Sequence, residues 1–129
     1  MRIRWAAAAA SFLSLLGCAA VSTDDGRRLA LTSPEFRAYV EQVFREQNRV
    51  ADELGFALEE PAARSAELER AETRLLEACA GVNELATARR DDQSLGVRRS
   101  LGAARSVPAC ERATESAAAA LAAQQANRR

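Results

Sequence analysis

Apolar residues recur every three or four positions through three stretches of this chain, which is the spacing of amphipathic α-helices. In the first stretch, the apolar positions are Phe36, Val40, Val43, Val50 and Leu54. Polar Gln47 fills the one gap in this stripe. Ser33 is a favourable N-cap residue and Pro34 fits the first helical position, so the pattern predicts a helix that begins directly after Ser33.

The second stretch continues the same spacing at Leu68, Ala71, Leu75, Ala78, Val82 and Leu85. Glu59-Glu60-Pro61 marks the turn before it and supplies an acidic helix start. We expect this helix to end near Arg89-Arg90, because cations suit a helix C-terminus. We expect Asp91-Asp92-Gln93-Ser94 to cap the start of a third helix. The change from positive to negative charge between Arg90 and Asp91 does not by itself exclude one continuous helix, in which Arg89 and Asp92 would form an ion pair.

The third stretch carries its apolar stripe at Val97, Leu101, Ala104 and Val107 and then becomes alanine-rich to about Ala126. Gly96 and Gly102 weaken the helix, and Pro108 cannot donate a backbone hydrogen bond. We therefore predict an all-α fold over residues 33–129. It is a small antiparallel bundle of about three helices, the third kinked near Pro108.

An uncharged run of twelve residues follows two arginines at the start of the chain and ends at Leu15-Leu16-Gly17-Cys18. This order of basic, apolar and small residues is typical of an export signal. The tetrapeptide resembles the lipobox of bacterial lipoprotein precursors. A plain secretory signal and an uncleaved membrane helix are the alternatives. The second is disfavoured because a span needs ~20 apolar residues.

The lipobox resemblance implies a processed and anchored product. Residues 1–17 would be removed as a signal peptide, and Cys18 would carry a diacylglyceryl group on its sulfur and an acyl chain on its new amine. Aspartate after the cysteine is the inner-membrane retention signal in many enteric bacteria, and this chain has Ala19 there. The resemblance therefore implies the periplasmic face of the outer membrane. Residues 18–32 show no helical or strand period, and we expect them to form a flexible tether, although Leu29 and Leu31 could dock on the domain.

Two cysteines remain after Cys18, and an even pair in an oxidising compartment favours a disulfide between Cys79 and Cys110. The midpoint between them falls inside the predicted turn. In an antiparallel helix pair, two residues equally far from the turn lie at the same height along the helices and face each other. This level rule also pairs Leu68 with Leu121 and Val82 with Val107. Packed helices bring facing Cα atoms to ~4–5 Å, near disulfide range. Two buried free thiols are the alternative.

The residue types that the chain lacks exclude several chemistries. It has no histidine and no lysine, so its eighteen basic residues are all arginine. This rules out Ser-His and Cys-His nucleophile pairs, imidazole metal ligands, Schiff bases and P-loops. We expect no catalytic site, no metal and no cofactor. Removing residues 1–17 leaves sixteen arginines against eighteen acids, a net charge of −2, which argues against a nucleic-acid partner.

Two groups of residues are candidates for interaction. All the aromatic residues after Cys18 lie in the first helix; Phe36, Tyr39 and Phe44 form either its core face or a surface for a protein partner. Residues 89–112 carry a net charge of +3 against −6 over residues 35–84. The candidate basic tip consists of Arg89, Arg90, Arg98 and Arg99. It either complements helix ends or contacts an acidic lipid, glycan or protein.

These observations favour a non-catalytic accessory lipoprotein. The membrane holds it through the lipid, and its bundle binds another envelope protein. The alternative is a lipoprotein that binds a small ligand, glycan or lipid between its helices. This alternative is less favoured, because few large core residues leave little room for a pocket of ~300 Å³. The pattern leaves the oligomeric state open.

Overall fold

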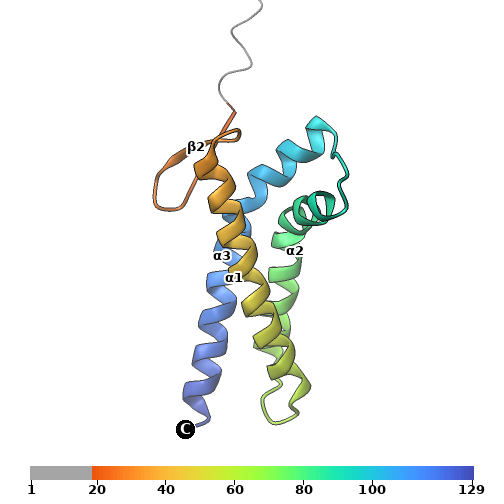
Figure 1. Cartoon of the computed structure of the whole chain (residues 1–129). Coiled ribbons are helices and arrows are strands. Elements are labelled where there is room, and N and C mark those ends of the chain that lie inside the picture. Colours follow the sequence, from red (N-terminus) through yellow and green to blue (C-terminus); the bar gives the residue numbers. More distant parts are fainter. Residues whose placement is uncertain (1–18) are drawn as a thin grey trace, which may run out of the picture.

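The computed structural model describes residues 19–129, which form a short β-hairpin followed by three long helices (Figure 1). The elements are β1 (Ala20–Ser22), β2 (Arg28–Ala30), α1 (Pro34–Glu59), α2 (Ala66–Arg90) and α3 (Val97–Asn127). The predicted small all-α bundle is confirmed. The predicted signal peptide, residues 1–17, and the predicted lipidation site, Cys18, lie outside the described residues.

Helix α1 begins where its sequence predicts. The Phe36 N–H donates to the Ser33 hydroxyl at 3.1 Å, and Pro34 occupies the first turn. The buried face of α1 consists of Phe36, Tyr39, Val43, Gln47, Val50 and Leu54. The gap in the apolar stripe is therefore filled by a buried amide, and among residues 19–129 its Oε1 has no hydrogen-bond partner.

Helix α2 starts later than predicted. The chain turns through residues 60–65 and Ser65 caps α2 by accepting from the Leu68 N–H at 3.3 Å, so Glu59-Glu60-Pro61 supplies only the turn. The other end of α2 lies at Arg90, as expected.

The link between α2 and α3 differs from the prediction in how it is capped. Asp92 has a left-handed backbone with φ 52°, which lets the Gln93 N–H bond the Ala88 carbonyl at 2.8 Å. Asp92 and Gln93 thus close the C-terminus of α2. The expectation that residues 91–94 cap the third helix is wrong, because α3 starts after Gly96 without a side-chain cap.

Helix α3 is continuous through Pro108, and Figure 1 shows its first part (cyan) running at an angle to the rest. Proline has no N–H, so the Ala104 carbonyl lacks its helical partner and the helix bends at this level. The predicted kink is confirmed. The first part of α3 and the end of α2 lean away from α1 together.

Helices α2 and α3 form the most extensively packed pair, and a disulfide joins them between Cys79 and Cys110. The two Cα atoms are 4.5 Å apart, within the predicted range. Near this link the helices approach closely at Gly81. A Cβ built there would lie 3.1 Å from the Ala103 Cα and 2.5 Å from the Ser106 hydroxyl. A side chain at this crossing would therefore need the Ser106 hydroxyl and the Ala103 backbone to shift, so glycine is favoured here by space and not by backbone conformation.

The predicted tether is wrong for residues 20–30, which form an antiparallel hairpin. Val21 pairs with Leu29, and both side chains are buried on the bundle. The alternative in which Leu29 docks on the domain is therefore the one observed. Asp24 in the hairpin turn binds Arg112 of α3 at 2.6 Å, which fastens the hairpin to the third helix.

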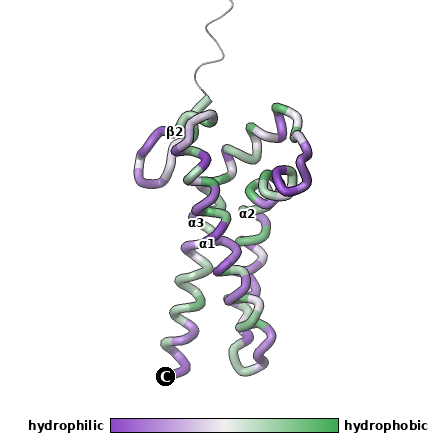
Figure 2. The backbone as a smooth tube through the Cα atoms, viewed as in Figure 1, coloured by the Kyte–Doolittle hydropathy of each residue, from purple (hydrophilic) through white to green (hydrophobic). Residues whose placement is uncertain are grey.

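The core runs the length of the bundle between the three helices. Its most buried large side chains are Val50, Leu54, Leu68, Leu75, Val82 and Val107. Figure 2 shows hydrophobic and hydrophilic residues interleaved along each helix, while the turn joining α2 to α3 is mostly hydrophilic. One core thus holds all three helices, with one end of the bundle opened by the bends.

Candidate functional site

A groove of about 870 Å³ lies at the end of the bundle that carries the hairpin. Its lining residues come from three segments, 31–44, 82–90 and 93–104, so one wall is α1 and the other the α2–α3 link with its flanking helix ends. We call it the hairpin-end groove. It arises because the bent ends of α2 and α3 lean away from α1 (Figure 1).

The floor and walls of the hairpin-end groove are mainly apolar. Phe36, Val40 and Phe44 line it from α1, and Leu101 and Val97 from α3. Val97 is 78% exposed, so its apolar side chain lines the groove while remaining open to solvent. Small side chains also line the groove at Ala86, Ala88 and Ala104. Because alanine fills little volume, the space between the helices stays open.

Charged side chains at the rim of the groove are mostly positive. Arg37, Arg89 and Arg90 belong to the lining, against one acid, Glu41. Arg89 lies 3.7 Å from Glu41 across the groove, so these two helices are bridged by an ion pair. The Arg37 side chain forms no ion pair or side-chain hydrogen bond within residues 19–129. The groove is therefore an apolar cleft with an available guanidinium at its edge.

The four arginines of the candidate basic tip are mostly paired within the chain. Arg90 binds Asp91 at 2.9 Å, and Arg99 binds Glu84 of α2. The side-chain hydrogen bond to Asp91 raises the pKa of Arg90 above its ordinary value. Arg98 forms no ion pair in the part of the chain described here. The structure thus does not bring the four together as one unpaired cationic surface.

The candidate aromatic residues divide between core and groove. Phe36 and Tyr39 are buried, and the half-buried Phe44 packs against the core and lines the groove. The Tyr39 hydroxyl donates to the Glu111 carboxylate of α3 at 2.6 Å. Burial is the main reason that the Tyr39 pKa is raised, and the hydrogen bond to Glu111 raises it further. Tyr39 therefore links α1 to α3.

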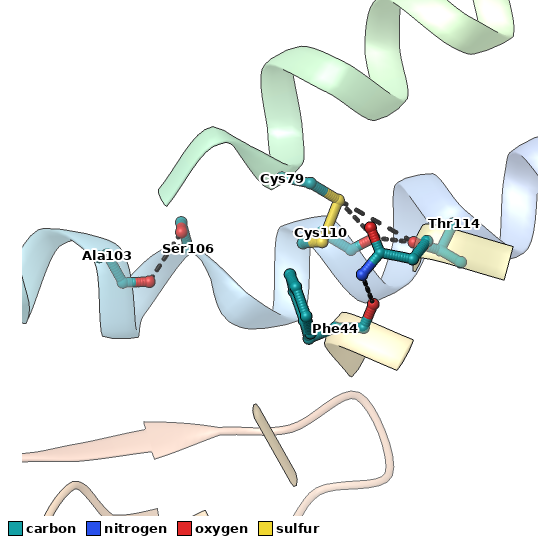
Figure 3. The surroundings of a disulfide bond; sticks show 7 residues. Phe44, Cys79, Ala103, Ser106, Cys110 and Thr114 are labelled. Atoms are coloured by element: carbon teal, nitrogen blue, oxygen red, sulfur yellow. Dashed lines mark hydrogen bonds between the residues drawn. A yellow bond between two sulfur atoms is a disulfide. The ribbon is translucent and has the colours of Figure 1, made fainter. Parts of the chain in front are cut away.

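The disulfide lies beside the groove and is sealed from solvent. Cys79 and Cys110 are both fully buried. Figure 3 shows Thr114 and the ring of Phe44 next to them, and the Thr114 hydroxyl donates to the Cys110 carbonyl at 2.8 Å. Phe44 thus has the disulfide on one side and the groove on the other. The disulfide therefore lies out of reach of a thiol reagent in the folded chain.

A smaller pocket of about 300 Å³ lies at the opposite end of the bundle. Phe56, which is 74% exposed, and Arg128 line it. Arg128 binds Glu60 at 2.8 Å, so its charge is neutralised locally. The side-chain hydrogen bond from Arg128 lowers the pKa of Glu60.

Within residues 19–129, no three histidine, cysteine or acidic side chains are grouped closely enough to hold a metal ion. None of the helices in this part of the chain is long and apolar enough to cross a membrane. Comparison with known proteins assigns no family, since no family model, curated protein or solved structure matches the chain.

Sequence reasoning missed the groove. Its apolar residues belong to the same stripes that predict the core, so their spacing carries no sign that some face a cleft. The signal that was available is the placement of small residues at Ala86 and Ala88 near the end of the second helix and at Ala104, four positions before Pro108, in the third. The bundle has room for a pocket well above ~300 Å³, since the groove measures about 870 Å³, and the prediction of little space between the helices is wrong.

Proposed function

We propose that this chain is a lipid-anchored, non-catalytic protein of the bacterial envelope whose hairpin-end groove binds an amphipathic molecule. The ligand has an apolar chain, which lies between α1 and the bent ends of α2 and α3, and an anionic head at the arginine rim. The observation that carries the proposal is the volume of about 870 Å³ combined with an apolar lining. Ligand pockets typically measure ~300–1,000 Å³ and are lined mainly by hydrophobic side chains.

The rim supports the anionic part of this proposal. Arg37, Arg89 and Arg90 outnumber Glu41, and Glu41 is already bound to Arg89. Arg37 is then the group best placed to meet a carboxylate or phosphate. A guanidinium can donate two parallel hydrogen bonds to either anion.

The anchoring part of the proposal rests on the lipobox Leu15-Leu16-Gly17-Cys18. Its test is metabolic labelling with a tagged fatty acid in a Gram-negative host. The wild-type chain is expected to incorporate the label and to lose residues 1–17. Cys18→Ser is expected to abolish labelling and leave the precursor uncut. Equal labelling of the two chains would contradict the assignment of the lipid to Cys18.

Ligand binding is tested by fluorescence on the chain from residue 18 with Cys18→Ala, so that no lipid is attached. This chain contains no tryptophan, because Trp5 is the only one in the sequence. Val97→Trp places a reporter in the groove wall, and Ser116→Trp places a control on the same helix outside the groove. A brominated long-chain fatty acid is expected to quench the first reporter saturably and the second only weakly.

Two further arms make this assay decisive. Arg37→Gln is expected to weaken binding of the fatty acid about two- to fivefold, the effect of losing one exposed charge pair, and to leave the matching brominated alcohol unaffected. Equal, non-saturable quenching of both reporters would overturn the proposal that the groove binds amphiphiles.

A second candidate function, docking of another envelope protein, is favoured by one observation. Phe56 is 74% exposed at the end of the bundle away from the hairpin, and exposed aromatic residues are enriched at protein interfaces. The test is isolation of crosslinked partners from intact envelopes with wild-type and Phe56→Ser chains. Arg98→Glu is the second variant, since Arg98 has no ion-pair partner within residues 19–129. Unchanged partners for both variants would rule out these two contacts.

A further inference from the structure

The described chain begins beside the hairpin-end groove. The Ala19 carbonyl accepts a hydrogen bond from the Leu31 N–H at 3.1 Å, which extends the ladder of the hairpin. Leu31 itself lines the groove. The first described residue is thus bonded to a residue of the groove wall.

The hairpin holds this starting point in place. Val21 and Leu29 are buried against the bundle, and Asp24 is paired with Arg112 of α3 at 2.6 Å. Thr23 is also buried, and its backbone N–H donates to the Arg27 carbonyl at 2.9 Å. The described chain therefore starts in a packed element at the groove, where the sequence predicts a flexible spacer of about a dozen residues.

Cys18 precedes Ala19 directly, and consecutive Cα atoms lie about 3.8 Å apart. We propose that the hairpin-end groove is the docking site for an acyl chain carried by Cys18 of the same molecule. This inference rests on the proposed lipidation of Cys18 and names the resident occupant of the groove that the proposed function describes. An external amphiphile would then compete with the attached chain for one site.

The groove suits an extended hydrocarbon chain in shape and chemistry. Its α1 wall runs from Phe36 to Phe44, eight residues or about 12 Å along the helix axis. Apolar side chains from α3, including Leu101 and the exposed Val97, form the facing wall. The hairpin that begins at Ala19 is at the same end, so the attached chain needs no linker to enter.

Docking one chain in the groove would change how the protein sits in a membrane. One acyl chain alone gives only marginal anchoring, and stable attachment needs more than one. A molecule with one chain in the groove is therefore held less firmly than one with every chain in the bilayer. The groove then sets whether two or three of the attached chains lie in the bilayer, and a ligand that displaces the docked chain returns it to the membrane.

The test is photo-crosslinking of the full chain in cells fed a fatty acid that carries a diazirine. After irradiation and proteolysis, mass spectrometry identifies which peptides are joined to the Cys18 peptide through its lipid. We expect crosslinks within one molecule, to peptides that contain 36–44 and 97–104. Ser100→Trp, which fills the groove from α3, is expected to reduce these crosslinks at least fivefold. Ser116→Trp, on the same helix but outside the groove, is expected to leave them unchanged.

Each other outcome has a distinct meaning. Crosslinks from Cys18 lipid only to phospholipid, or equal crosslinks in both tryptophan variants, overturn the inference and leave ligand binding by the groove standing. Groove peptides joined to a phospholipid and not to the Cys18 peptide assign the groove to an external lipid, which also overturns the inference. Absence of label on Cys18 overturns both the inference and the proposed anchoring.

Discussion

Reduction of the Cys79–Cys110 disulfide is the perturbation whose effect on stability follows most directly from the structure. The bond joins residues 31 positions apart in two packed helices. Cross-linking a loop of this length removes conformational entropy from the unfolded chain worth about 3–4 kcal/mol on the chain-entropy model. For a domain of this size, that loss corresponds to a fall in the melting temperature of about 15 °C.

The assay is urea unfolding followed by circular dichroism on three samples. These are the oxidised chain, the same chain reduced, and the double variant Cys79→Ala/Cys110→Ala. The difference in unfolding free energy between the oxidised and the reduced chain isolates the effect of the covalent link, because both chains keep the buried sulfur atoms. The difference between the last two measures the loss of sulfur packing at two fully buried positions. The double variant with reductant is the control and is expected not to change.

Reduction is also expected to increase the dependence of the unfolding free energy on urea, because an unfolded chain without the link exposes more surface. A free-energy difference below about 1 kcal/mol with an unchanged urea dependence would refute the reasoning. It would mean that α2 and α3 stay associated in the unfolded chain without the bond.

Three further predictions concern single side chains. Gly81→Ala is expected to lower the free energy of unfolding by about 1–2 kcal/mol, because the added methyl group would press on the Ala103 backbone. Urea unfolding measures this change, and a variant of equal or higher stability would contradict the close approach of the helices. Asp92→Gly is expected to raise stability by about 0.5–1 kcal/mol, since glycine adopts the left-handed conformation at φ 52° without strain, and an unchanged midpoint would contradict this. Tyr39 has a raised pKa, so its protonated form favours the folded state. Its contribution to stability is complete below pH 10 and falls as the pH rises further, as tyrosinate absorbance of this single tyrosine will show. Tyr39→Phe is expected to lower the free energy of unfolding by about 1.5–3 kcal/mol near neutral pH, because it removes the hydrogen bond to Glu111. The stability of this variant is expected not to fall further above pH 10 as that of the wild type does. A Tyr39 that titrates near pH 10 would contradict the effect of burial.

The sequence by itself determined the helices and the pairing of two of them. Helix periodicity and capping are local, so Ser33 and Pro34 mark the start of α1 without knowledge of the rest of the fold. The level rule for an antiparallel pair needs only a turn position, and it placed Cys79 opposite Cys110. Pro108 bends α3 because a missing N–H acts within one turn of the helix.

Only the tertiary structure decided the hairpin, the groove and the state of the arginines. Strands of three residues have too few positions to show a period, and theirs are stabilised by packing Val21 and Leu29 on distant helices. Whether an apolar side chain such as Val97 faces the core or a cleft depends on how two bent helices diverge from a third. Likewise Arg99 meets Glu84 only because the chain folds back, and no local pattern encodes that meeting.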